Sequence, residues 1–515
     1  MTMESINPAT GERLGEIEPT PTSKIVRLLT EARAAQREWS KLPYSVRGQT
    51  LRAFANLLVE RKRTVAELIS RENGKPLVEA YSSEIFPSLD IVNYYVARTR
   101  KILKSRRVKI GIPLLKTKKA FVRYEPYGAV AIISPWNYPL LLPLGQIVPA
   151  LMAGNAVLFK PSEYTPLVGN LISEFMWEAG VPRSLLTLVQ GKGDVGSALI
   201  SAGPDKVFFT GSTATGKKVA EASAKNATPV SLELGSKDAM IVLEDADIDS
   251  VTSGALWGAF MNAGQTCISV ERCFVHEKVF DSFIGLLQKK MKELKIGAGT
   301  DPDNEIGAII HRAQYETITT QVNEAVKKGA RIVEGGDFFE RDGGYFVSPT
   351  LMVDVCMDSL LMTEETFGPV LPVIKFRDVA EAVELANASK FGLGASIWTA
   401  DSKRGLQLAR KISAGAVIVN DVVSYYGIAD GLVGGVSESG AGRVHGREGI
   451  LEMVSPKYYE VERAPRMKKL WWFNYDVNTL SFFEIAIDFL FSQKIYKRTS
   501  SLFKLAPKLL RMKKL

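Results

Sequence analysis

A cysteine and a glutamate lie in sequence surroundings that would allow them to take part in chemistry. Cys267 lies in Asn262-Ala-Gly-Gln-Thr-Cys-Ile268, where Gly, Gln and Thr indicate a polar turn. A thiol in such a turn is a candidate nucleophile, although a lone cysteine is more often a small buried side chain. Glu233 interrupts the apolar run Val230-Ser-Leu-Glu-Leu-Gly235. Because a carboxylate among apolar residues must be paired or shift its pKa upward, Glu233 is either a strand-end ion pair or a candidate general base.

Three further segments have the composition of binding turns. Ser134-Pro-Trp-Asn-Tyr-Pro139 is fixed by two prolines, and from it Asn137 offers an amide donor. The alternative for this segment is a structural turn that packs Trp136. Phe209-Thr-Gly-Ser-Thr213 follows a predicted strand and begins a helix, where backbone N–H groups can bind phosphate oxygens. Gly191-Lys-Gly-Asp-Val-Gly196 fits GxGxxG, which on its own is a weak indication of dinucleotide binding.

Six motifs, in their order and spacing, closely resemble those of the aldehyde dehydrogenase superfamily from about Asn7 to Val461. They are PWNYP, KPSE (Lys160 to Glu163), FTGST, LELG, GQTC and EETFGP (Glu364 to Pro369). The resemblance implies NAD(P)-dependent oxidation of an aldehyde, with Cys267 as the nucleophile that forms a thiohemiacetal and then a thioester. It implies that the Asn137 side chain and the Cys267 main-chain N–H stabilise the oxyanion. It also implies that Glu233 activates the water that hydrolyses the thioester, which favours a free carboxylic acid as product.

The same resemblance implies where the cofactor binds. Lys160 and Glu163 match the positions that hold the adenosine ribose. Because a carboxylate accepts hydrogen bonds from ribose hydroxyls and repels a 2′-phosphate, Glu163 favours NAD, whereas Lys160 leaves NADP open. The other expected cofactor-binding residues are Gly211 and Ser212 at the pyrophosphate, Glu365 and Phe367 at the nicotinamide ribose and ring, Gly193 by the adenine, and Ser134, Pro135, Trp136, Ser162, Phe209, Thr210, Leu234 and Gly235.

The substrate funnel expected from the resemblance is apolar, which favours a long, apolar aldehyde. Its residues are Tyr138, Leu142, Met261, Ile268, Tyr425 and Tyr426. Each CH₂ group buried there would contribute about 0.8 kcal/mol. The segment Lys116-Thr-Lys-Lys-Ala-Phe-Val-Arg-Tyr-Glu125 is similar to a branch that includes carotenoid-type and long-chain aldehyde oxidisers. The alternative substrate is a small-metabolite semialdehyde. Family members commonly have Pro-Phe before the late Gly-Gly and a Lys after it, whereas this chain has Leu432-Val-Gly-Gly-Val-Ser437.

Two other classes of protein fit the sequence less well. A glyceraldehyde-phosphate-type enzyme would pair its cysteine with a histidine, but the histidine nearest to Cys267 in sequence, His276, falls in a predicted strand. A non-catalytic scaffold on the same fold would not need Cys267, Glu233 and Asn137 together. The three cysteines form no CxxC pair and the three histidines are scattered, so neither a metal site nor a disulfide framework is expected.

Apolar runs bounded by Gly or Pro alternate with helical stretches, which predicts an α/β fold with parallel sheets in two lobes. The predicted strands are 128–134, 156–159, 186–189, 206–210, 239–243, 272–275, 371–376 and 416–420, and the predicted helices are 23–70, 279–294, 312–328 and 379–386. We expect a cofactor domain at 1–107 and 127–235 and a catalytic domain at 236–450. The resemblance further implies an oligomerisation sheet from 108–126 and 451–463, in a homodimer or tetramer.

The end of the chain has a different composition. Of the net charge of +9, +8 comes from Arg466 onward, where eleven basic residues accompany three acidic ones. A neutral body with a basic tail indicates a surface-binding segment rather than a nucleic-acid-binding protein. Four aromatic residues in Leu470–Tyr475, a short apolar stretch at Ser481–Phe491 and an amphipathic helix predicted at Leu502–Leu515 favour peripheral binding to an anionic membrane surface. The alternative is that the tail, residues 464–515, packs on a neighbouring subunit. The polar N-terminus lacks the apolar core of a signal peptide, and we expect a cytoplasmic protein.

Overall fold

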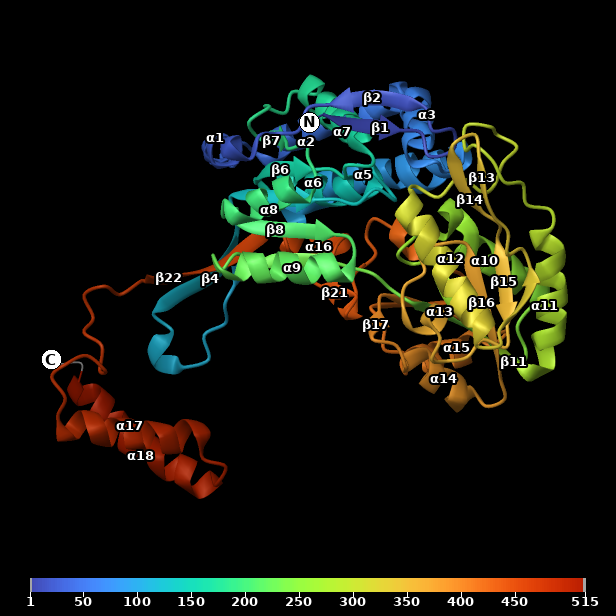
Figure 1. The fold of residues 1–515 in the computed structure, drawn as a ribbon. Coiled ribbons are helices and arrows are strands. Elements are labelled where there is room, and N and C mark those ends of the chain that lie inside the picture. Colours follow the sequence, from blue (N-terminus) through green and yellow to red (C-terminus); the bar gives the residue numbers. More distant parts are fainter. Residues whose placement is uncertain (1, 513–515) are drawn as a thin grey trace. The chain divides into compact units, whose positions relative to one another are not determined.

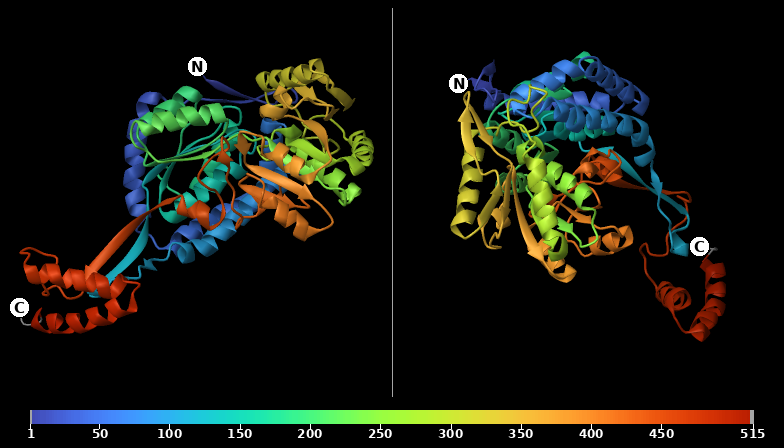
Figure 2. Two further views of the ribbon diagram at one scale, coloured as in Figure 1. Left: turned by 90° about the horizontal axis from the view of Figure 1, so that it is seen from below. Right: turned by 90° about the vertical axis from the view of Figure 1, so that its right-hand side faces the viewer.

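The computed structural model describes residues 2–512, and the chain divides into two compact units. The larger unit comprises Met1–Lys104 and Tyr124–Pro456, and the smaller comprises Ser105–Arg123 and Lys457–Leu515. Within the larger unit, two sheets each carry helices on their faces (Figures 1 and 2). This arrangement is the two-lobed α/β fold that the alternation of apolar runs and helical stretches predicts.

The first sheet has six strands in the order β21-β9-β8-β5-β6-β7. The strands are β5 (Ala129–Ile133), β6 (Ala156–Lys160), β7 (Leu186–Leu188), β8 (Lys206–Thr210), β9 (Val230–Glu233) and β21 (Gly440–Ala441). All neighbouring pairs are parallel except β21 with β9. The chain leaves β5 first toward β6 and β7 and later returns to β8 on its other side. The carboxyl ends of β5 and β8 therefore form a topological switch point, where doubly wound sheets bind ligands.

Helices pack on both faces of this sheet, as crossover connections between parallel strands require (Figure 1). They are α1 (Ile25–Trp39), α2 (Tyr44–Glu60), α3 (Lys62–Asn73), α4 (Leu77–Glu79), η2 (Ala80–Ile85), α5 (Phe86–Ile102), α6 (Leu141–Ala153), α7 (Pro166–Glu178), α8 (Gly193–Ser201), α9 (Thr213–Ala224) and α16 (Gly446–Leu451). The predicted helical region 23–70 is thus three helices, interrupted before α2 and at Arg61. Two small strands, β1 (Met3–Ile6) and β2 (Arg13–Ile17), form a separate antiparallel pair.

The second sheet has seven strands in the order β12-β15-β16-β11-β10-β18-β19, of which only the β12–β15 pair is antiparallel. The strands are β10 (Asp238–Val242), β11 (Val270–His276), β12 (Arg331–Glu334), β15 (Thr350–Val353), β16 (Val370–Phe376), β18 (Gly394–Trp398) and β19 (Ala416–Val419). Its helices are α10 (Ile248–Phe260), α11 (Glu277–Met291), α12 (Arg312–Lys327), α13 (Leu360–Thr363), α14 (Val379–Asn387) and α15 (Ser402–Ala409). Two short antiparallel pairs accompany this sheet: β13 (Phe338–Arg341) with β14 (Gly344–Val347), and β17 (Phe391–Gly392) with β20 (Val436–Ser437).

The two lobes share one continuous hydrophobic core. It runs from Val130 and Phe159 in the first sheet to Met240 and Phe274 in the second, all of them fully buried or nearly so. The late segment β21 strengthens the connection, because Gly440 pairs with Glu233 at the edge of the first sheet. Gly440 has φ +129° and lies so close to the carbonyl of Leu232 that a Cβ atom would be 2.0 Å from its oxygen. Only glycine fits there.

The smaller unit combines strands and a helical hairpin. In the sheet order β22-β4-β3, β4 (Lys118–Pro126) is the central strand, β22 is Val454–Glu462 and β3 is Arg106–Arg107. The tail forms α17 (Val477–Phe491) and α18 (Ile495–Met512), which pack together around Phe482 and Leu505. The helix expected from Leu502 thus begins seven residues earlier. No helix among the described residues is both long and apolar enough to cross a membrane.

Candidate active site

The segment that carries Cys267 is a strained turn between α10 and β11. Asn262, Ala263 and Gly264 all adopt left-handed backbone conformations, with φ of 51°, 53° and 70°. Two such non-glycine residues in succession are rare and cost conformational energy, which the surrounding contacts must offset. A Cβ atom at Gly264 would lie 2.2 Å from the carbonyl oxygen of Gly368, so the turn and the EETFGP loop are in close contact.

Gln265 fixes this turn from within. Its side-chain Nε2 donates to the carbonyls of Asn262 (3.0 Å) and Ala308 (3.3 Å), and its Oε1 accepts from the N–H of Ile310 (3.0 Å). Cys267 follows two residues later and is partly exposed. Among residues 2–512, no other residue accepts a hydrogen bond from the main-chain N–H of Cys267. That donor is therefore free to bind a substrate oxygen.

Asn137 and Tyr138 contact the cysteine turn directly. Asn137 lies between β5 and α6, and its side-chain Nδ2 donates to the carbonyl of Gln265 (3.2 Å). The Tyr138 hydroxyl lies 2.8 Å from the Thr266 hydroxyl. The two motifs, which are more than a hundred residues apart in sequence, thus meet on either side of the residues that precede Cys267. The structure therefore places the Asn137 amide against the residues that precede Cys267.

Three buried carboxyl groups surround the thiol. Burial raises the pKa of Cys267 well above its ordinary value, and negative charge at Glu365, Asp238 and Glu233 raises it further. The resting thiol is therefore protonated, and its attack on a carbonyl requires loss of that proton. Asp238, the first residue of β10, accepts from the N–H of Gly394 and has a pKa that burial raises to about 7.

Glu233, at the end of β9, has the environment of a general base. Burial raises its pKa to about 8, and the charge of Arg443 partly opposes that rise. No cation lies within ion-pair distance of Glu233 in the described part of the chain, so the strand-end ion pair considered from the sequence is not present. A carboxyl group with a pKa near neutrality can accept a proton from water and later release it.

The EETFGP loop is held by a buried ion pair. The Glu271 carboxylate accepts from the main-chain N–H groups of Thr366 (2.8 Å) and Phe367 (2.9 Å), and it pairs with the Lys237 ammonium at 2.6 Å. Glu365 in turn accepts from the N–H of Ser236 (2.8 Å). This loop therefore faces the end of β9, with Glu365 next to Gly235. The ring of Phe367 meets Trp136 edge to face, with centroids 5.4 Å apart.

The expected cofactor residues gather at one edge of the first sheet and in this facing loop. After β5 come Ser134, Pro135 and Trp136, and after β6, which ends at Lys160, come Ser162 and Glu163. Strand β8 ends with Phe209 and Thr210, and Gly211 and Ser212 lead into α9, which Ser212 caps. After β9 come Leu234 and Gly235, and α8 begins at Gly193. Because the carboxyl ends of parallel strands meet at the same edge, segments far apart in sequence come together here.

Polar groups at this edge fit a dinucleotide. The Ser134 hydroxyl and the Gln146 Oε1 are buried without a partner among the described residues. A Cβ atom at Gly193 would meet nothing within 4 Å, so the start of α8 is open. The Lys160 ammonium is buried, with a pKa lowered by burial, and lies 3.7 Å from the partly exposed Glu163 carboxylate. Together they present hydroxyl, amide, carboxylate and ammonium groups to an open helix N-terminus.

The expected substrate residues differ in burial and in hydrogen bonding. Leu142, Met261 and Ile268 are buried. Tyr425 and Tyr426 are partly exposed. Burial raises the pKa of both hydroxyl groups, and negative charge at Cys267 and at Glu233 raises it further. Tyr138, by contrast, has its hydroxyl engaged by Thr266 rather than open to an apolar funnel.

The difference from the family pattern just before Gly434 and Gly435 can be located in the structure. Val433, which stands where the family commonly has Phe, is fully buried and pairs with Val444. Leu432 is 44% exposed. The aromatic side chain common in the family is thus replaced by a smaller buried one.

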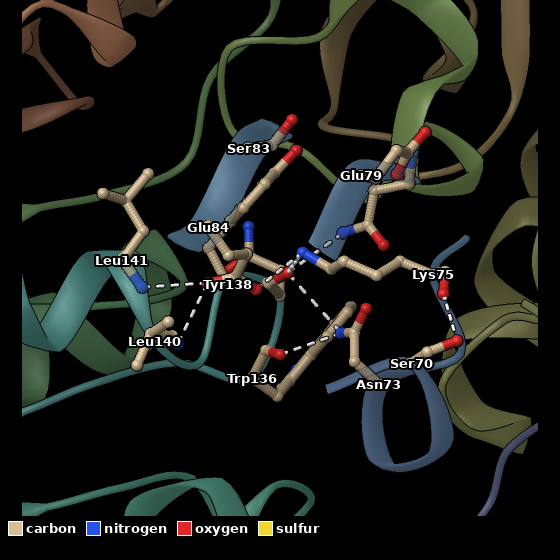
Figure 3. A network of polar contacts seen from close by, with 12 residues as sticks. Ser70, Asn73, Lys75, Glu79, Ser83, Glu84, Trp136, Tyr138, Leu140 and Leu141 are labelled. Atoms are coloured by element: carbon tan, nitrogen blue, oxygen red, sulfur yellow. Dashed lines mark hydrogen bonds and ion pairs between the residues drawn. The ribbon is translucent and has the colours of Figure 1, made fainter. Parts of the chain in front are cut away.

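Sequence reasoning missed several residues that position the site. Lys75, Glu79, Glu84 and Asn262 form a buried polar network behind the Asn137 turn (Figure 3). Lys75 stands between a glycine and a proline, a pattern that indicates an exposed turn, and nothing in its local sequence predicts burial. Among the described residues, no group of three or more His, Cys, Asp or Glu side chains could hold a metal ion.

Comparisons with known proteins agree with this geometry. The family described as Aldehyde dehydrogenase family matches residues 1–459. The 4,4′-diapolycopene aldehyde oxidase of Methylomonas sp is 38% identical over 492 residues, which covers 96% of this chain and 92% of that protein. A putative succinate-semialdehyde dehydrogenase [NADP(+)] 2 of Mycobacterium ulcerans is 36% identical over 88% of each chain. The NAD⁺ complex structure of aldehyde dehydrogenase from Bacillus cereus is 34% identical, with a TM-score of 0.86 over 90% of this chain and 93% of that one.

Proposed function

The chain belongs to the aldehyde dehydrogenase family and is an NAD(P)-dependent oxidoreductase that acts on aldehydes; from this premise we propose that it oxidises a long, apolar aldehyde to the carboxylic acid. We further propose that Cys267 is the nucleophile, Asn137 the oxyanion donor and Glu233 the base. The observation that carries these roles is the meeting of the Asn137 amide with the Cys267 turn near a buried Glu233 that has no ion-pair partner among the described residues. The net reaction consumes the aldehyde, NAD(P)⁺ and water and yields the acid, NAD(P)H and a proton.

The first step requires a thiolate, because the buried thiol is protonated at rest. Once its proton has passed to Glu233 or to water, the Cys267 sulfur attacks the aldehyde carbon and forms a thiohemiacetal. The charge that develops on oxygen is met by the Asn137 Nδ2 and the free N–H of Cys267. One such donor typically stabilises the transition state by about 3–4 kcal/mol.

Oxidation and hydrolysis complete the cycle. When bound, NAD(P)⁺ supplies the hydride acceptor, and Lys160, Glu163, Ser212, Glu365 and Phe367 are the residues proposed to hold it. The thioester left on Cys267 is attacked by a water molecule whose proton Glu233 accepts. A carboxyl group whose pKa lies near 8 balances basicity against the fraction of molecules that are ionised. Expulsion of the sulfur then restores the cysteine and releases the acid.

The proposal of a long, apolar substrate has two supports. None of the six proposed funnel residues is charged, so a carboxylate-bearing semialdehyde would find no ionic partner among them. In addition, the match to the diapolycopene aldehyde oxidase covers 96% of this chain. Because residues 464–515 make up about a tenth of the chain, that match must extend into the tail. The match to the succinate-semialdehyde dehydrogenase covers only 88%.

We propose that the tail binds an anionic membrane surface. In the described part of the tail, aromatic and aliphatic side chains are exposed both before the helical hairpin and on it. They are Trp472, Phe473, Tyr475, Val477, Leu480, Ile487, Phe491, Ile495, Tyr496, Leu502 and Phe503. Lys494, Lys497, Arg498 and Lys504 are exposed among them. Apolar side chains flanked by cations insert at the headgroup level of anionic bilayers. A lipid-dissolved aldehyde would be found there.

A chain-length series tests the substrate class. We expect kcat/KM to rise from butanal to decanal, by up to about fourfold for each added methylene, because each buried CH₂ is worth about 0.8 kcal/mol. Succinic semialdehyde, measured under the same conditions with NAD and with NADP, should be a poor substrate. A preference for succinic semialdehyde over decanal would overturn the proposed substrate class but leave the roles of Cys267 and Glu233 untouched.

A further inference from the structure

A lysine ammonium is fully buried behind the PWNYP turn. Lys75 follows Gly74, which ends α3 with φ +94°, and both its side chain and that of Glu84 have no exposed surface. The Lys75 Nζ and the Glu84 carboxylate are 2.8 Å apart. Figure 3 shows the Lys75 side chain extending to the group formed by Glu84 and Tyr138. Burying a charge this deeply costs free energy unless the charge is paired and fully hydrogen-bonded. The partners of the Lys75 ammonium therefore indicate what the buried charge does.

All three hydrogens of this ammonium have a partner. One is shared with Glu84, and a second is donated to the main-chain carbonyl of Asn137 at 2.8 Å. The ammonium also lies 3.7 Å from the centroid of the Tyr138 ring, which places the remaining hydrogen against the aromatic face. The side chains of Asn137 and Tyr138 both reach the Cys267 turn. Lys75 therefore contacts both of them from the opposite side.

The two carboxyl groups that act on Lys75 lie at the start of a π-helical segment and within it. Glu79 ends α4, and Glu84 lies in the π-helix η2. In an α-helix, residues five apart point about 140° away from each other. The i→i+5 hydrogen bonds of a π-helix bring them closer to one face. Glu79 and Glu84 both act on Lys75, since each raises the pKa that burial lowers.

The two carboxylates tie the network to both turns of the site. Glu84 Oε2 accepts from the N–H groups of Leu140 (3.0 Å) and Leu141 (2.8 Å) at the start of α6. Glu79 Oε2 accepts from the N–H of the strained Asn262 (2.8 Å). The Asn262 side chain then donates to the carbonyls of Asn137 and Gln265, at 3.1 Å each. The carbonyl of Asn137 thus accepts from both Lys75 and Asn262.

We propose that Lys75 is a positioning residue, which together with Glu79 and Glu84 fixes the Asn137 main chain so that its side-chain amide is held against the Cys267 turn. This inference rests on the proposed role of Asn137 as an oxyanion donor. At the start of helix α6, Glu84 and the carbonyl of Tyr138 accept from the N–H groups, so the bond from Lys75 to the Asn137 carbonyl engages no donor of that helix. It fixes instead the peptide plane from which the amide projects.

A double-mutant cycle between Lys75→Met and Asn137→Ala tests the proposal. The readout is the rate of the first NADH turnover, measured by rapid mixing of the full-length enzyme with saturating cofactor and a short soluble aldehyde. Lys75→Met should slow this rate by about 10- to 100-fold, because small displacements of catalytic groups have effects of that size. In the Asn137→Ala background the same substitution should slow it less than threefold, since the group that Lys75 positions is already gone. The KM for the cofactor should change little in either background.

Lys206→Met is the matched control. Lys206 is also a buried lysine paired with a carboxylate, that of Glu452, but it begins β8 at the end of the sheet far from Thr210. It should lower the melting temperature and leave the first-turnover rate within twofold of the wild type. If Lys75→Met fails to fold, Lys75→Met with Glu84→Gln removes both charges at once and enters the same cycle.

The outcomes separate this inference from the proposed function. If Lys75→Met slowed the first turnover by the same factor in the wild type and in Asn137→Ala, the positioning role of Lys75 would be overturned. The proposed role of Asn137 as oxyanion donor would be unaffected. A normal first-turnover rate for Asn137→Ala alone would instead contradict the proposed oxyanion donor. Strong coupling, together with an unaffected Lys206→Met variant, would establish that Lys75 acts through Asn137.

Discussion

The Asn137 side chain donates a hydrogen bond to the main-chain carbonyl of Gln265 at 3.2 Å, two residues before Cys267. A side-chain amide has two N–H donors, so this bond leaves the second one available. The first bond therefore orients the amide, and the second can meet a developing oxyanion without reorganisation when the reaction occurs. The turn that carries the proposed nucleophile and the proposed oxyanion donor are thus linked before any substrate binds.

Cys267→Ser should abolish NADH formation. A serine hydroxyl is close to a thiol in size but a much weaker nucleophile at neutral pH. We expect turnover to fall at least about a thousandfold, as for other catalytic nucleophiles, while the circular dichroism spectrum and the affinity for NAD by calorimetry stay unchanged. Cys273→Ser is the matched control, because Cys273 is a fully buried thiol in β11. Wild-type turnover by Cys267→Ser would remove this residue from the mechanism.

Glu233→Gln should separate the two halves of the reaction. Without a base for the water molecule, thioester hydrolysis slows more than thioester formation. Rapid mixing should give a burst of NADH close to one per site, followed by a steady phase slowed by about 10²- to 10⁴-fold, the usual contribution of a general base. Wild-type rates in both phases would show that another group activates the water.

The pH dependence of turnover should carry the signature of Glu233. Burial raises its pKa to about 8, and the base acts only in its ionised form. The steady-state rate should therefore rise with pH up to about 8 and level off above it. In Glu233→Gln this rising limb should vanish from the steady phase. A wild-type rate that levels off near pH 5 would mean that Glu233 ionises as an ordinary carboxyl group.

Glu163→Gln should shift cofactor preference toward NADP. The carboxylate would accept from ribose hydroxyls and repel a 2′-phosphate, and the nearby Lys160 would attract that phosphate once the repulsion is gone. We expect the ratio of kcat/KM for NAD to that for NADP to fall by about tenfold, which corresponds to about 1.4 kcal/mol. An unchanged ratio would place the discriminating contact elsewhere.

Trp472→Ser with Phe473→Ser should weaken membrane binding. Full-length protein should co-sediment with vesicles rich in phosphatidylserine at low salt and less with neutral phosphatidylcholine vesicles. The paired substitution should reduce that binding severalfold and leave activity on short aldehydes unchanged. Phe86→Ser is the control, because Phe86 is 74% exposed but lies outside the tail. Failure of the wild type to bind anionic vesicles would favour the alternative, a tail that packs on a neighbouring subunit, which light scattering of tail variants would reveal.

The sequence predicted well those features that depend on local pattern. The buried strands β5, β6 and β8 coincide with apolar runs, because strands covered on both faces are mostly apolar. The seven-residue error at the start of α18 also has a local cause: the residues at 495–500 are all exposed and carry no amphipathic pattern that extends the helix. In the segment 108–126, expected to form part of an oligomerisation sheet, only β4 is a long strand; its neighbour β3 lies just before the segment and is two residues long.

Features that depend on tertiary structure could not be predicted. Lys75 and Glu84 are charged residues in a turn and a polar helical segment, and their burial follows from packing against the Asn137 turn. Asp238 follows Lys237 in the sequence, yet it is buried near Cys267 while Lys237 pairs with Glu271. The cofactor motifs could be placed, because parallel strands bring their carboxyl ends to one edge wherever they occur in the chain.

The pairing of β21 with β9 has a consequence for synthesis of the protein. Glu233 lies on β9, whose outer edge is completed only by Gly440, about two hundred residues later. Until the ribosome has produced and released that segment, the growing chain carries an open strand edge beside its proposed base, and such edges are prone to pair with other chains. Premature termination before residue 440 would leave a protein that can contain Cys267 and the dinucleotide edge but has an unfinished sheet. The growing chain therefore carries this open edge from about residue 233 to residue 440, and we expect it to be prone to aggregation during that interval.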